Sequence, residues 1–321
     1  MPDNETAPGG AGVRHLTVDA DSSGQRLDNY LVRELKGVPR TRLYRALRKG
    51  EVRVNKGRVR ADYRLVAGDR VRIPPLRQSA PSGPAAVPPY WAEQLSRRIV
   101  HESDGLLVIN KPAGLAVHGG SGLHFGLIEC LRQMRPDDRY LELVHRLDRD
   151  TSGLILVARR PAVLRELHRL LRDAAMDKRY LALVAGNWPR HRGVVDAPLE
   201  KNVLQSGERL ARVARAGRHS VTEFTVLERL RGATLLEARP ITGRTHQIRV
   251  HAQHAGFPLL GDAKYGSERS VALCRQVGLK RLFLHASSLA FVLPNEGRLA
   301  LRAALDMELE SVLDMLRKRL E

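Results

Sequence analysis

Cysteine is scarce in this sequence. Among its 321 residues the only two cysteines are Cys130 and Cys274, and they lie far apart. The sequence therefore predicts neither a disulfide framework nor a multi-cysteine zinc site, and we expect both thiols to be small buried side chains. The histidines include no His-Glu-x-x-His pair, and the spacing of His246, His251 and His254 is not by itself a metal signature.

Long apolar runs are also missing. No stretch reaches the roughly 18 apolar residues that a spanning helix needs. The first twelve residues are polar and contain no basic segment followed by an apolar one, so the pattern does not predict a signal peptide. We therefore expect a cytoplasmic protein without a membrane partner.

Acidic residues are few relative to basic ones. The chain has 35 Asp and Glu against 54 Lys and Arg, which gives a formal net charge of +19. Such an excess favours a polyanionic partner such as nucleic acid, and the lack of apolar runs makes a membrane the weaker interpretation.

Composition divides the chain into segments. Residues 1–20 are rich in Gly, Pro and polar residues, and we expect a disordered tail there. A small domain is expected over residues 21–76. Prolines are dense in the following stretch, so residues 77–97 are expected to be a linker. Residues 98–321 form the expected large domain.

The small domain carries a stripe of cations. Helical spacing predicts one helix over residues 25–35 and a second over residues 40–49, and short strands follow. Cations recur here with few acids between them. A solvated helix face would explain a single stripe, but this recurrence favours RNA binding. The candidate RNA-binding residues are Arg26, Arg42, Arg45, Lys49 and Arg53.

Two motifs in this part resemble the S4 RNA-binding domain. They are GQRLD at residues 24–28 and RKGEVRVN at residues 48–55. The resemblance covers roughly residues 24–76, and it implies a small RNA-binding module of two helices and a short sheet.

The large domain is organised around residues 145–153, HRLDRDTSG. Apolar residues flank this charged stretch on both sides, and they predict buried strands that hold the loop between them. Asp148 in the loop, Tyr180 on a predicted strand and Arg249 on a predicted helix could form a carboxylate, an aromatic wall and a charge partner. Each also has an ordinary structural explanation, and sequence spacing alone does not show that they meet.

Periodicity predicts the surrounding elements. The pattern favours a short helix that carries Arg249, with Thr245 as its N-cap and Gly256 as its stop, and a strand is the alternative for this segment. Other helices are expected over residues 127–134, 161–175 and 307–320, and strands over residues 105–110, 178–184, 194–199, 219–228, 233–239 and 282–286. This pattern alone indicates only a mixture of helices and strands.

The large domain resembles the RluA-type pseudouridine synthases. The motifs are HRLDRDTSG at residues 145–153, KRY at residues 178–180, GRTHQIRVH at residues 243–251 and LHA at residues 284–286. Together with the S4-like part they narrow the resemblance to the RluC and RluD branches, with RluC the more similar. These branches modify large-subunit ribosomal RNA. The resemblance implies an α+β fold with a mixed, mainly antiparallel sheet, and a reaction that needs no cofactor or metal.

The resemblance also implies roles for individual residues. Asp148 matches the essential aspartate, and Arg249 matches the arginine that keeps it ionised. Tyr180 matches the tyrosine that stacks on uracil, and Arg146 matches the arginine that takes the place of the extruded nucleotide. Leu284 is expected to line the base pocket.

Two other classes of function stay open at this point. One is a non-catalytic S4-type RNA-binding or ribosome-assembly protein. The other is a hydrolase that uses Asp148 with Asp150 or Glu142 as a glycosidase pair. We expect a monomer that acts on ribosomal RNA, either naked or within assembling ribosomal particles.

Overall fold

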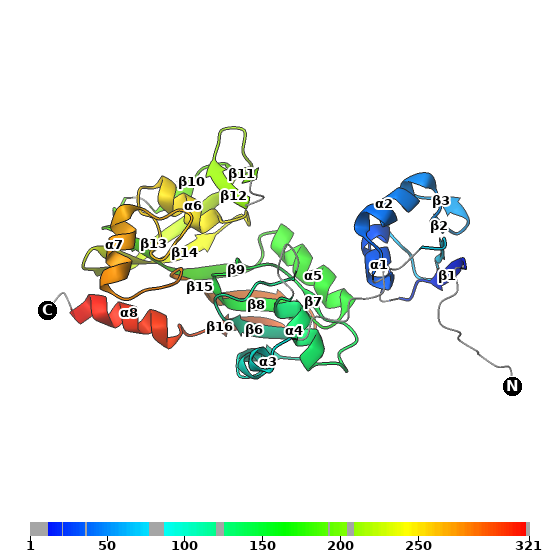
Figure 1. Cartoon of the computed structure of the whole chain (residues 1–321), viewed down its shortest axis with the longest axis horizontal. Helices are drawn as coiled ribbons and strands as arrows, with labels where there is room; N and C mark the ends of the chain where they lie inside the picture. Colours follow the sequence, from blue (N-terminus) through cyan, green and yellow to red (C-terminus); the bar gives the residue numbers. More distant parts are fainter. Residues whose placement is uncertain are drawn as a thin grey trace. The chain divides into compact units, whose positions relative to one another are not determined.

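The computed structural model describes residues 12–20, 22–35, 37–76, 87–119, 125–191, 193–203 and 209–318. The chain divides into two compact units, Met1–Ala86 and Val87–Glu321 (Figure 1). Among the helices of the described residues, none has both the length and the apolar character needed to cross a bilayer.

The N-terminal unit packs two helices against a small sheet. The predicted helices are present as α1, Leu27–Glu34, and α2, Arg40–Lys49, which ends at Gly50 with φ 71°. Their apolar faces share one core with the sheet. The sheet has the order β1-β4-β2-β3, with bounds Arg14–Thr17 for β1, Arg53–Val54 for β2, Gly57–Arg58 for β3 and Arg70–Ile73 for β4.

Two expected boundaries are wrong. The disordered tail expected over residues 1–20 extends too far, because β1 lies within that range and pairs antiparallel with β4. This strand is mostly exposed at a sheet edge, so its sequence lacks apolar alternation. The linker of residues 77–97 extends too far, because α3 occupies Pro89–Ser96 and buries Leu95 against α4. Proline is compatible with the first turn of a helix, so the density of prolines does not exclude a helix in this segment.

The large unit is built on a ten-stranded sheet. Its order is β10-β13-β14-β9-β15-β8-β6-β5, with β16 added to β15 and β7 to β8. All pairs are antiparallel except β15 with β8, so the predicted α+β fold with a mixed, mainly antiparallel sheet is confirmed. The bounds are Ile99–Glu102 for β5, Leu106–Lys111 for β6, Glu142–Leu143 for β7, Ser152–Ala158 for β8, Asp177–Ala185 for β9, Val194–Asp196 for β10, Val221–Leu230 for β13, Ala233–Pro240 for β14, Leu284–Leu293 for β15 and Gly297–Arg302 for β16.

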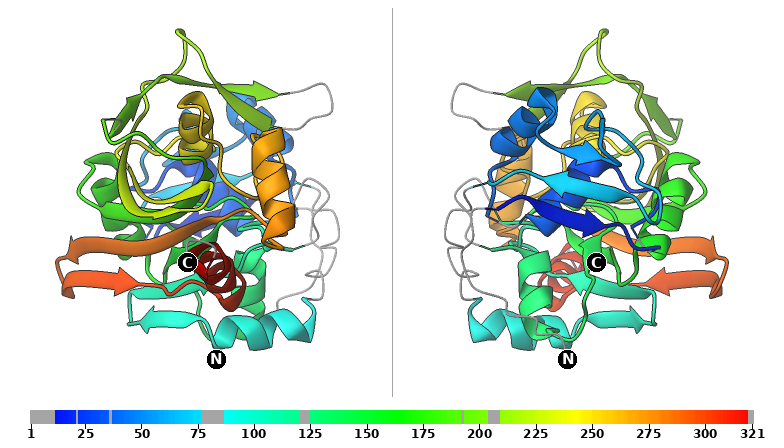
Figure 2. Two further views of the ribbon diagram at one scale, coloured as in Figure 1. Left: turned by 90° about the vertical axis from the view of Figure 1, so that its left-hand side faces the viewer. Right: turned by 90° about the vertical axis from the view of Figure 1, so that its right-hand side faces the viewer.

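Helices cover both faces of this sheet (Figures 1 and 2). Alternate residues of β9 face opposite sides, so Ala182 and Val184 pack with α6 while Leu183 and Ala185 pack with α7 and α8. On β6 and β8, one face packs with α3 and α4 and the other with α5. The remaining bounds are Leu127–Met134 for α4, Pro161–Arg172 for α5, Gln247–His254 for α6, Glu268–Gln276 for α7 and Met307–Lys318 for α8.

Besides α3, five elements of the large unit are not predicted by the sequence patterns. They are β11, Leu199–Val203, β12, Arg209–Val213, β5, β16 and α7. The first two pair only with each other in the described sheets, and β16 is an edge strand with no buried residue. Of the glycine-rich stretch at residues 118–122, positions 120–122 lie outside the described residues. Both cysteines are buried, as expected.

Candidate active site

The loop of residues 145–151 leads directly into β8 at the centre of the sheet. β8 runs parallel to β15, with Ser152 beside His285 and Gly153 beside Ala286. Gly153 has φ 109°, and a Cβ on it would lie 2.3 Å from the Ala286 carbonyl oxygen. Only glycine therefore allows the loop to approach β15 this closely.

Two buried polar groups hold the same loop. The Lys111 ammonium donates to the carbonyls of Pro112, Leu115 and Arg149 at 2.8, 2.9 and 3.0 Å. Burial lowers the pKa of Lys111 to about 7. Ser152 Oγ lies 2.9 Å from His285 Nδ1. The part of the loop that follows Asp148 is therefore held by hydrogen bonds at Arg149 and Ser152.

Arg249 connects two carboxylates. Its Nε and Nη2 each donate to Asp262 at 2.7 Å, and Nη1 donates to Asp148 Oδ2 at 3.3 Å. The Asp262 side chain is completely buried, whereas the Asp148 side chain is 20% exposed. Asp148 is therefore the accessible member of this trio, and it pairs with Arg249 rather than with its neighbours Arg146 or Arg149.

Charge and burial act in opposite directions at this trio. Burial is the largest influence on the pKa of the Asp262 carboxyl and raises it, but the hydrogen bonds and charge of Arg249, together with the backbone N–H groups of Lys264 and Tyr265, make the net shift downward. Burial likewise lowers the pKa of Arg249, and the hydrogen bonds and charges of Asp262 and Asp148 together more than offset this effect. The result is a permanent guanidinium cation beside Asp148.

Tyr180 and Leu284 come from the two neighbouring strands. In the sheet register Tyr180 of β9 lies beside Ala286 of β15, which itself lies beside Gly153 of β8. Burial, with a smaller contribution from the charge of Asp148, raises the pKa of Tyr180, so the phenol remains neutral. Three adjacent strands thus bring together residues far apart in the sequence.

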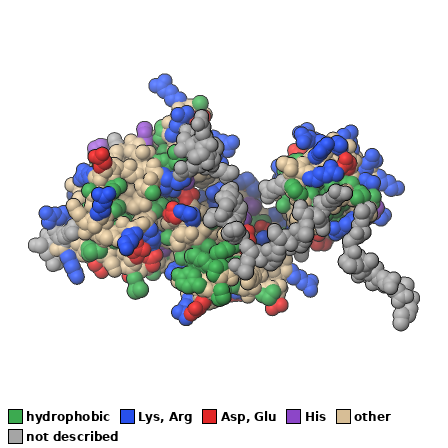
Figure 3. All heavy atoms as spheres, in the orientation of Figure 1, with side chains coloured by type: hydrophobic (Ala, Val, Ile, Leu, Met, Phe, Trp, Pro, Cys, Tyr) green, Lys and Arg blue, Asp and Glu red, His purple; other side chains and the backbone are tan. Residues whose placement is uncertain are grey.

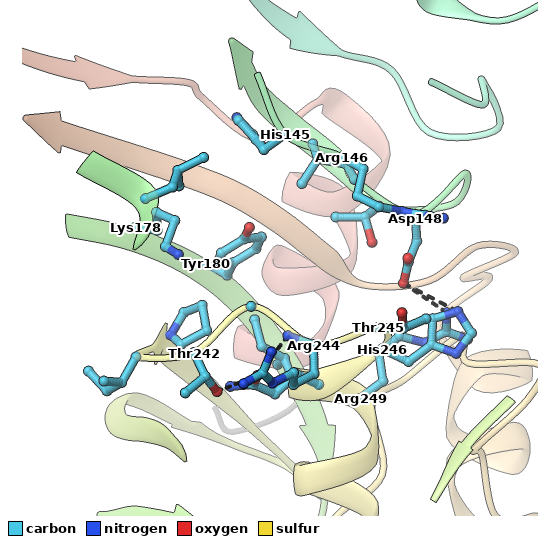
Figure 4. A pocket seen from close by; sticks show the side chains of 18 of the residues that line it. His145, Arg146, Asp148, Lys178, Tyr180, Thr242, Arg244, Thr245, His246 and Arg249 are labelled. Carbon is cyan, nitrogen blue, oxygen red and sulfur yellow. Dashed lines mark hydrogen bonds and ion pairs between the residues drawn. The ribbon is translucent and has the colours of Figure 1, made fainter. Parts of the chain in front are cut away.

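These side chains surround one cavity of about 620 Å³. Figure 4 shows Asp148, Tyr180, Arg146 and Arg249 around it. Arg146 is exposed, and Leu284 adds an apolar wall. All five site residues predicted for the large domain therefore line the same cavity. Cations that also line it are Arg172, Lys178, Lys201 and Arg244.

The helix carrying Arg249 begins one residue later than expected. The N-cap of α6 is His246, with φ 54°, and not Thr245. Gln247 explains the local geometry, because its amide oxygen accepts from the Thr242 hydroxyl and the Arg244 N–H, and its amide nitrogen donates to Val221 and Thr222 on β13. This buried amide ties the loop to the sheet without a side-chain cap at Thr245.

Sequence reasoning missed four residues of the site. His246 and Gln247 stand inside a motif already singled out, but no role was predicted for them. Asp262 and Tyr265 lie in GDAKYG, a polar stretch bounded by glycines at residues 261–266. A carboxylate in such a stretch beside an apolar segment was the available signal.

The candidate RNA-binding residues of the N-terminal unit differ in their surroundings. Arg26 forms two hydrogen bonds to Asp28, at 3.1 and 2.7 Å, so its charge is partly used inside the unit. Arg42 and Lys49 of α2 lie 3.8 and 3.9 Å from Glu51. Arg45 of α2 and Arg53 of β2 are exposed. Figure 3 shows Lys and Arg side chains gathered on this unit.

The glycosidase arrangement finds no support in the geometry. Asp150 pairs with Arg149 at 3.1 Å, and Glu142 pairs with Arg132 at 2.9 Å. Neither carboxylate lines the cavity with Asp148. Within the described part of the chain, no group of three or more His, Cys, Asp or Glu residues is placed to hold a metal ion.

Comparison with known proteins identifies the class of protein. The family model for RNA pseudouridylate synthases matches residues 105–254, and the S4 domain model matches residues 25–71. The chain belongs to the RNA pseudouridylate synthase family and is an RNA pseudouridine synthase, an isomerase. The resemblance drawn from the motifs is thereby confirmed.

Individual relatives show which RNA pseudouridine synthases the chain is similar to. The chain is 53% identical to Ribosomal large subunit pseudouridine synthase C of Pasteurella multocida (strain Pm70) over 96% of this chain and 95% of the relative. It is 52% identical to the Escherichia coli (strain K12) protein of the same name over 95% and 97%. The solved structure of Human RNA Pseudouridylate Synthase Domain Containing 4 matches with a TM-score of 0.59 and 29% identity, over 71% of this chain and 95% of that one.

Proposed function

We propose that this enzyme converts specific uridines of large-subunit ribosomal RNA to pseudouridine, and that Asp148 is the reacting carboxylate. The observation that carries the proposal is the contact of Asp148 with a buried guanidinium at the base of a cavity large enough for a nucleotide. The names of the relatives support ribosomal RNA as the substrate.

The reaction is an isomerisation whose atoms balance within the substrate. The bond from N1 to C1′ breaks, the uracil rotates, and a bond from C5 to C1′ forms. C5 loses a proton and N1 gains one. Asp148 acts either on the nucleotide directly or as a base toward the 2′ proton, and both roles need the ionised form that the Arg249 cation favours.

The other cavity residues have roles that follow from their chemistry. Tyr180 presents a neutral aromatic ring that can stack on the uracil, and its phenol is the candidate for the later proton transfer from C5. Leu284 supplies an apolar wall. The target base must leave its helix before it can reach Asp148, and the exposed Arg146 takes its place in the RNA.

The N-terminal unit is proposed to bind the RNA around the target. The described residues up to Leu76, β1 included, act as an S4-like domain, and residues 87–321 carry the chemistry. Arg42, Arg45, Lys49 and Arg53 contact phosphates, whereas Arg26 contributes less because Asp28 holds it. The proposed enzyme is a monomer that acts on ribosomal RNA, either naked or within assembling particles.

The decisive test measures release of tritium from C5 of labelled uridine in ribosomal RNA. Asp148→Asn keeps the size of the side chain but removes the charge, and it should abolish release while RNA binding persists. The matched control is Asp150→Asn, two residues away and outside the cavity, which should stay within a fewfold of the unchanged protein. Full activity of Asp148→Asn would refute the assignment of this residue.

The sequence also left open a protein that binds ribosomal RNA without modifying it. The S4 domain match and the net charge of +19 account for RNA binding only, whereas the similarity to RNA pseudouridylate synthases shows an enzyme. The binding-only alternative predicts that the unchanged protein binds ribosomal RNA and retains all of the tritium. Release of tritium would exclude this alternative, and release of free uracil would instead indicate a hydrolase.

A further inference from the structure

His246 is held in a conformation that few side chains adopt. It precedes α6 with φ 54° and ψ 20°, the left-handed region that favours glycine. Its ring is only 10% exposed and packs edge-on against Tyr265, with ring centroids 5.6 Å apart. Unusual backbone of this kind persists where the surroundings require a particular side-chain position, so the contacts of the ring are informative.

Tyr265 determines which ring nitrogen of His246 carries the hydrogen. The Tyr265 hydroxyl accepts the backbone N–H of Ala211 at 2.9 Å and lies 2.7 Å from His246 Nδ1. Burial raises the pKa of Tyr265, so the phenol keeps its hydrogen. Among the described contacts, Nδ1 is the acceptor available to that hydrogen. In the neutral ring the hydrogen of His246 is then on Nε2.

The protonated nitrogen faces the reacting carboxylate. His246 Nε2 lies 3.7 Å from Asp148 Oδ2, the same oxygen that Arg249 Nη1 contacts at 3.3 Å (Figure 4). Tyr265 also supports the second donor, because the Arg249 guanidinium lies over its ring at 5.1 Å from the centroid. Both nitrogens therefore approach Oδ2, and among the described residues no hydrogen bond from either side chain reaches Oδ1.

We propose that His246 is a positioning residue: as the Nε2–H tautomer set by Tyr265, it holds Asp148 Oδ2 together with Arg249, so that Oδ1 is the atom that meets the nucleotide. This inference rests on the proposed role of Asp148. It adds to that role a choice between the two carboxylate oxygens of Asp148, and a chain of contacts from Tyr265 through His246 to Asp148. These contacts transfer no proton during the reaction, but they restrict rotation of the carboxylate.

The test compares two variants of His246 that differ in whether the new side chain can donate a hydrogen bond. His246→Gln retains an amide N–H donor near the position of Nε2, whereas His246→Leu has none, and both must adopt the same left-handed backbone. We expect the single-turnover rate of tritium release to fall about 10- to 100-fold in His246→Leu, because small misplacements of reacting groups have effects of that size. His246→Gln should recover most of the rate, and the Kd for RNA should change less than about twofold in both.

A spectroscopic measurement tests the tautomer in the intact enzyme. With ¹⁵N-labelled histidine, the signals of His246, assigned by their loss in His246→Gln, should show a hydrogen on Nε2 and none on Nδ1. Tyr265→Phe removes only the hydroxyl and should produce a mixture of tautomers with a reduced single-turnover rate. This variant keeps the aromatic ring, so it remains informative even if a change at His246 prevents folding.

Three results would overturn the inference. They are an unchanged single-turnover rate in a folded His246→Leu, equal losses in His246→Leu and His246→Gln, and a hydrogen on Nδ1 in the unchanged enzyme. The Asp148→Asn variant distinguishes failure of the inference about His246 from failure of the proposed function. If Asp148→Asn is inactive while His246→Leu is normal, only the role of His246 is refuted. If Asp148→Asn is active, the proposed role of Asp148 is refuted as well.

Discussion

Asp148 owes part of its environment to Asp262, a residue that does not line the cavity. A buried guanidinium without partners would destabilise the fold, and Asp262 removes that problem with two hydrogen bonds of 2.7 Å. Because Asp262 already satisfies Nε and Nη2, Arg249 presents only Nη1 to Asp148. The longer 3.3 Å contact to Asp148 leaves this carboxylate accessible, whereas a second bidentate pair would have held it away from a substrate.

His145, at the start of the same loop, should make stability depend on pH. Its Nε2 accepts the backbone N–H of Leu156 at 3.2 Å, and burial lowers its pKa to about 4 from the ordinary value of 6.5. Between these values the unfolded chain binds a proton that the folded protein does not. Stability is therefore retained above pH 6.5 and is lost as the pH falls toward 4, by about 2 to 3 kcal/mol.

Chemical denaturation at a series of pH values measures this effect. The comparison is with His145→Gln, which cannot gain a charge. The difference in the free energy of unfolding between the unchanged protein and the variant should shift against the unchanged protein as the pH falls from 7 to 4. A difference that stays constant over this range would show that His145 is not buried as the neutral ring.

At the scale of elements, the parallel pair β8 and β15 positions the site. Ala on Gly153 would place a Cβ 2.3 Å from the Ala286 carbonyl oxygen, and the φ of 109° is itself unfavourable. Gly153→Ala should therefore cost more than about 2 kcal/mol of unfolding free energy and reduce tritium release, because the strands must separate where the Asp148 loop ends. Thermal unfolding and single-turnover assays measure both effects.

Gly114→Ala is the matched control for Gly153→Ala. Gly114 also has a positive φ, of 82°, but a Cβ there meets nothing within 4 Å. Gly114→Ala should therefore lower the free energy of unfolding only by the backbone penalty of about 1 kcal/mol. Equal losses in the two variants would mean that the backbone conformation, and not the close approach of β8 to β15, decides the outcome.

The elements that could be predicted from the sequence are those with a strong apolar period. In α8, Leu309, Val312, Leu313 and Leu316 are all buried as predicted. β11, β12 and β16 are stabilised by pairing with a neighbouring strand, which local sequence does not encode. The start of α6 was misplaced for a related reason, because Gln247 contacts β13, and only tertiary structure reveals that contact.

The candidate site could be predicted only in part. Asp148 and Arg249 are 101 residues apart, and only the family resemblance indicated that they meet. Asp262, His246 and Tyr265 were not predicted because their contributions depend on distances to other side chains. A motif shows which residue types are present, whereas the sheet register shows which of them become neighbours.

For the whole molecule, the boundary between the units lies before Val87. Val87 and Leu95 are buried in a core shared with α4, and Trp91 packs against it. A protein that begins at Val87 keeps this core, whereas one that begins at Ile99 loses three of its apolar side chains.

Removing the N-terminal unit should therefore weaken RNA binding without unfolding the rest. For residues 87–321 we expect circular dichroism typical of a folded protein, weaker binding of ribosomal RNA, and a shallower dependence of affinity on salt. Each lost phosphate contact reduces the slope of log K against log salt by roughly 0.7 to 0.9, so loss of contacts from Arg42, Arg45, Lys49 and Arg53 should reduce it by about 3.

The full chain with these four residues changed to Gln is the matched control and should show a similar slope. If the truncated protein binds RNA with the slope of the full chain, the N-terminal unit does not contact phosphates; if it is unfolded, the division into two domains is wrong.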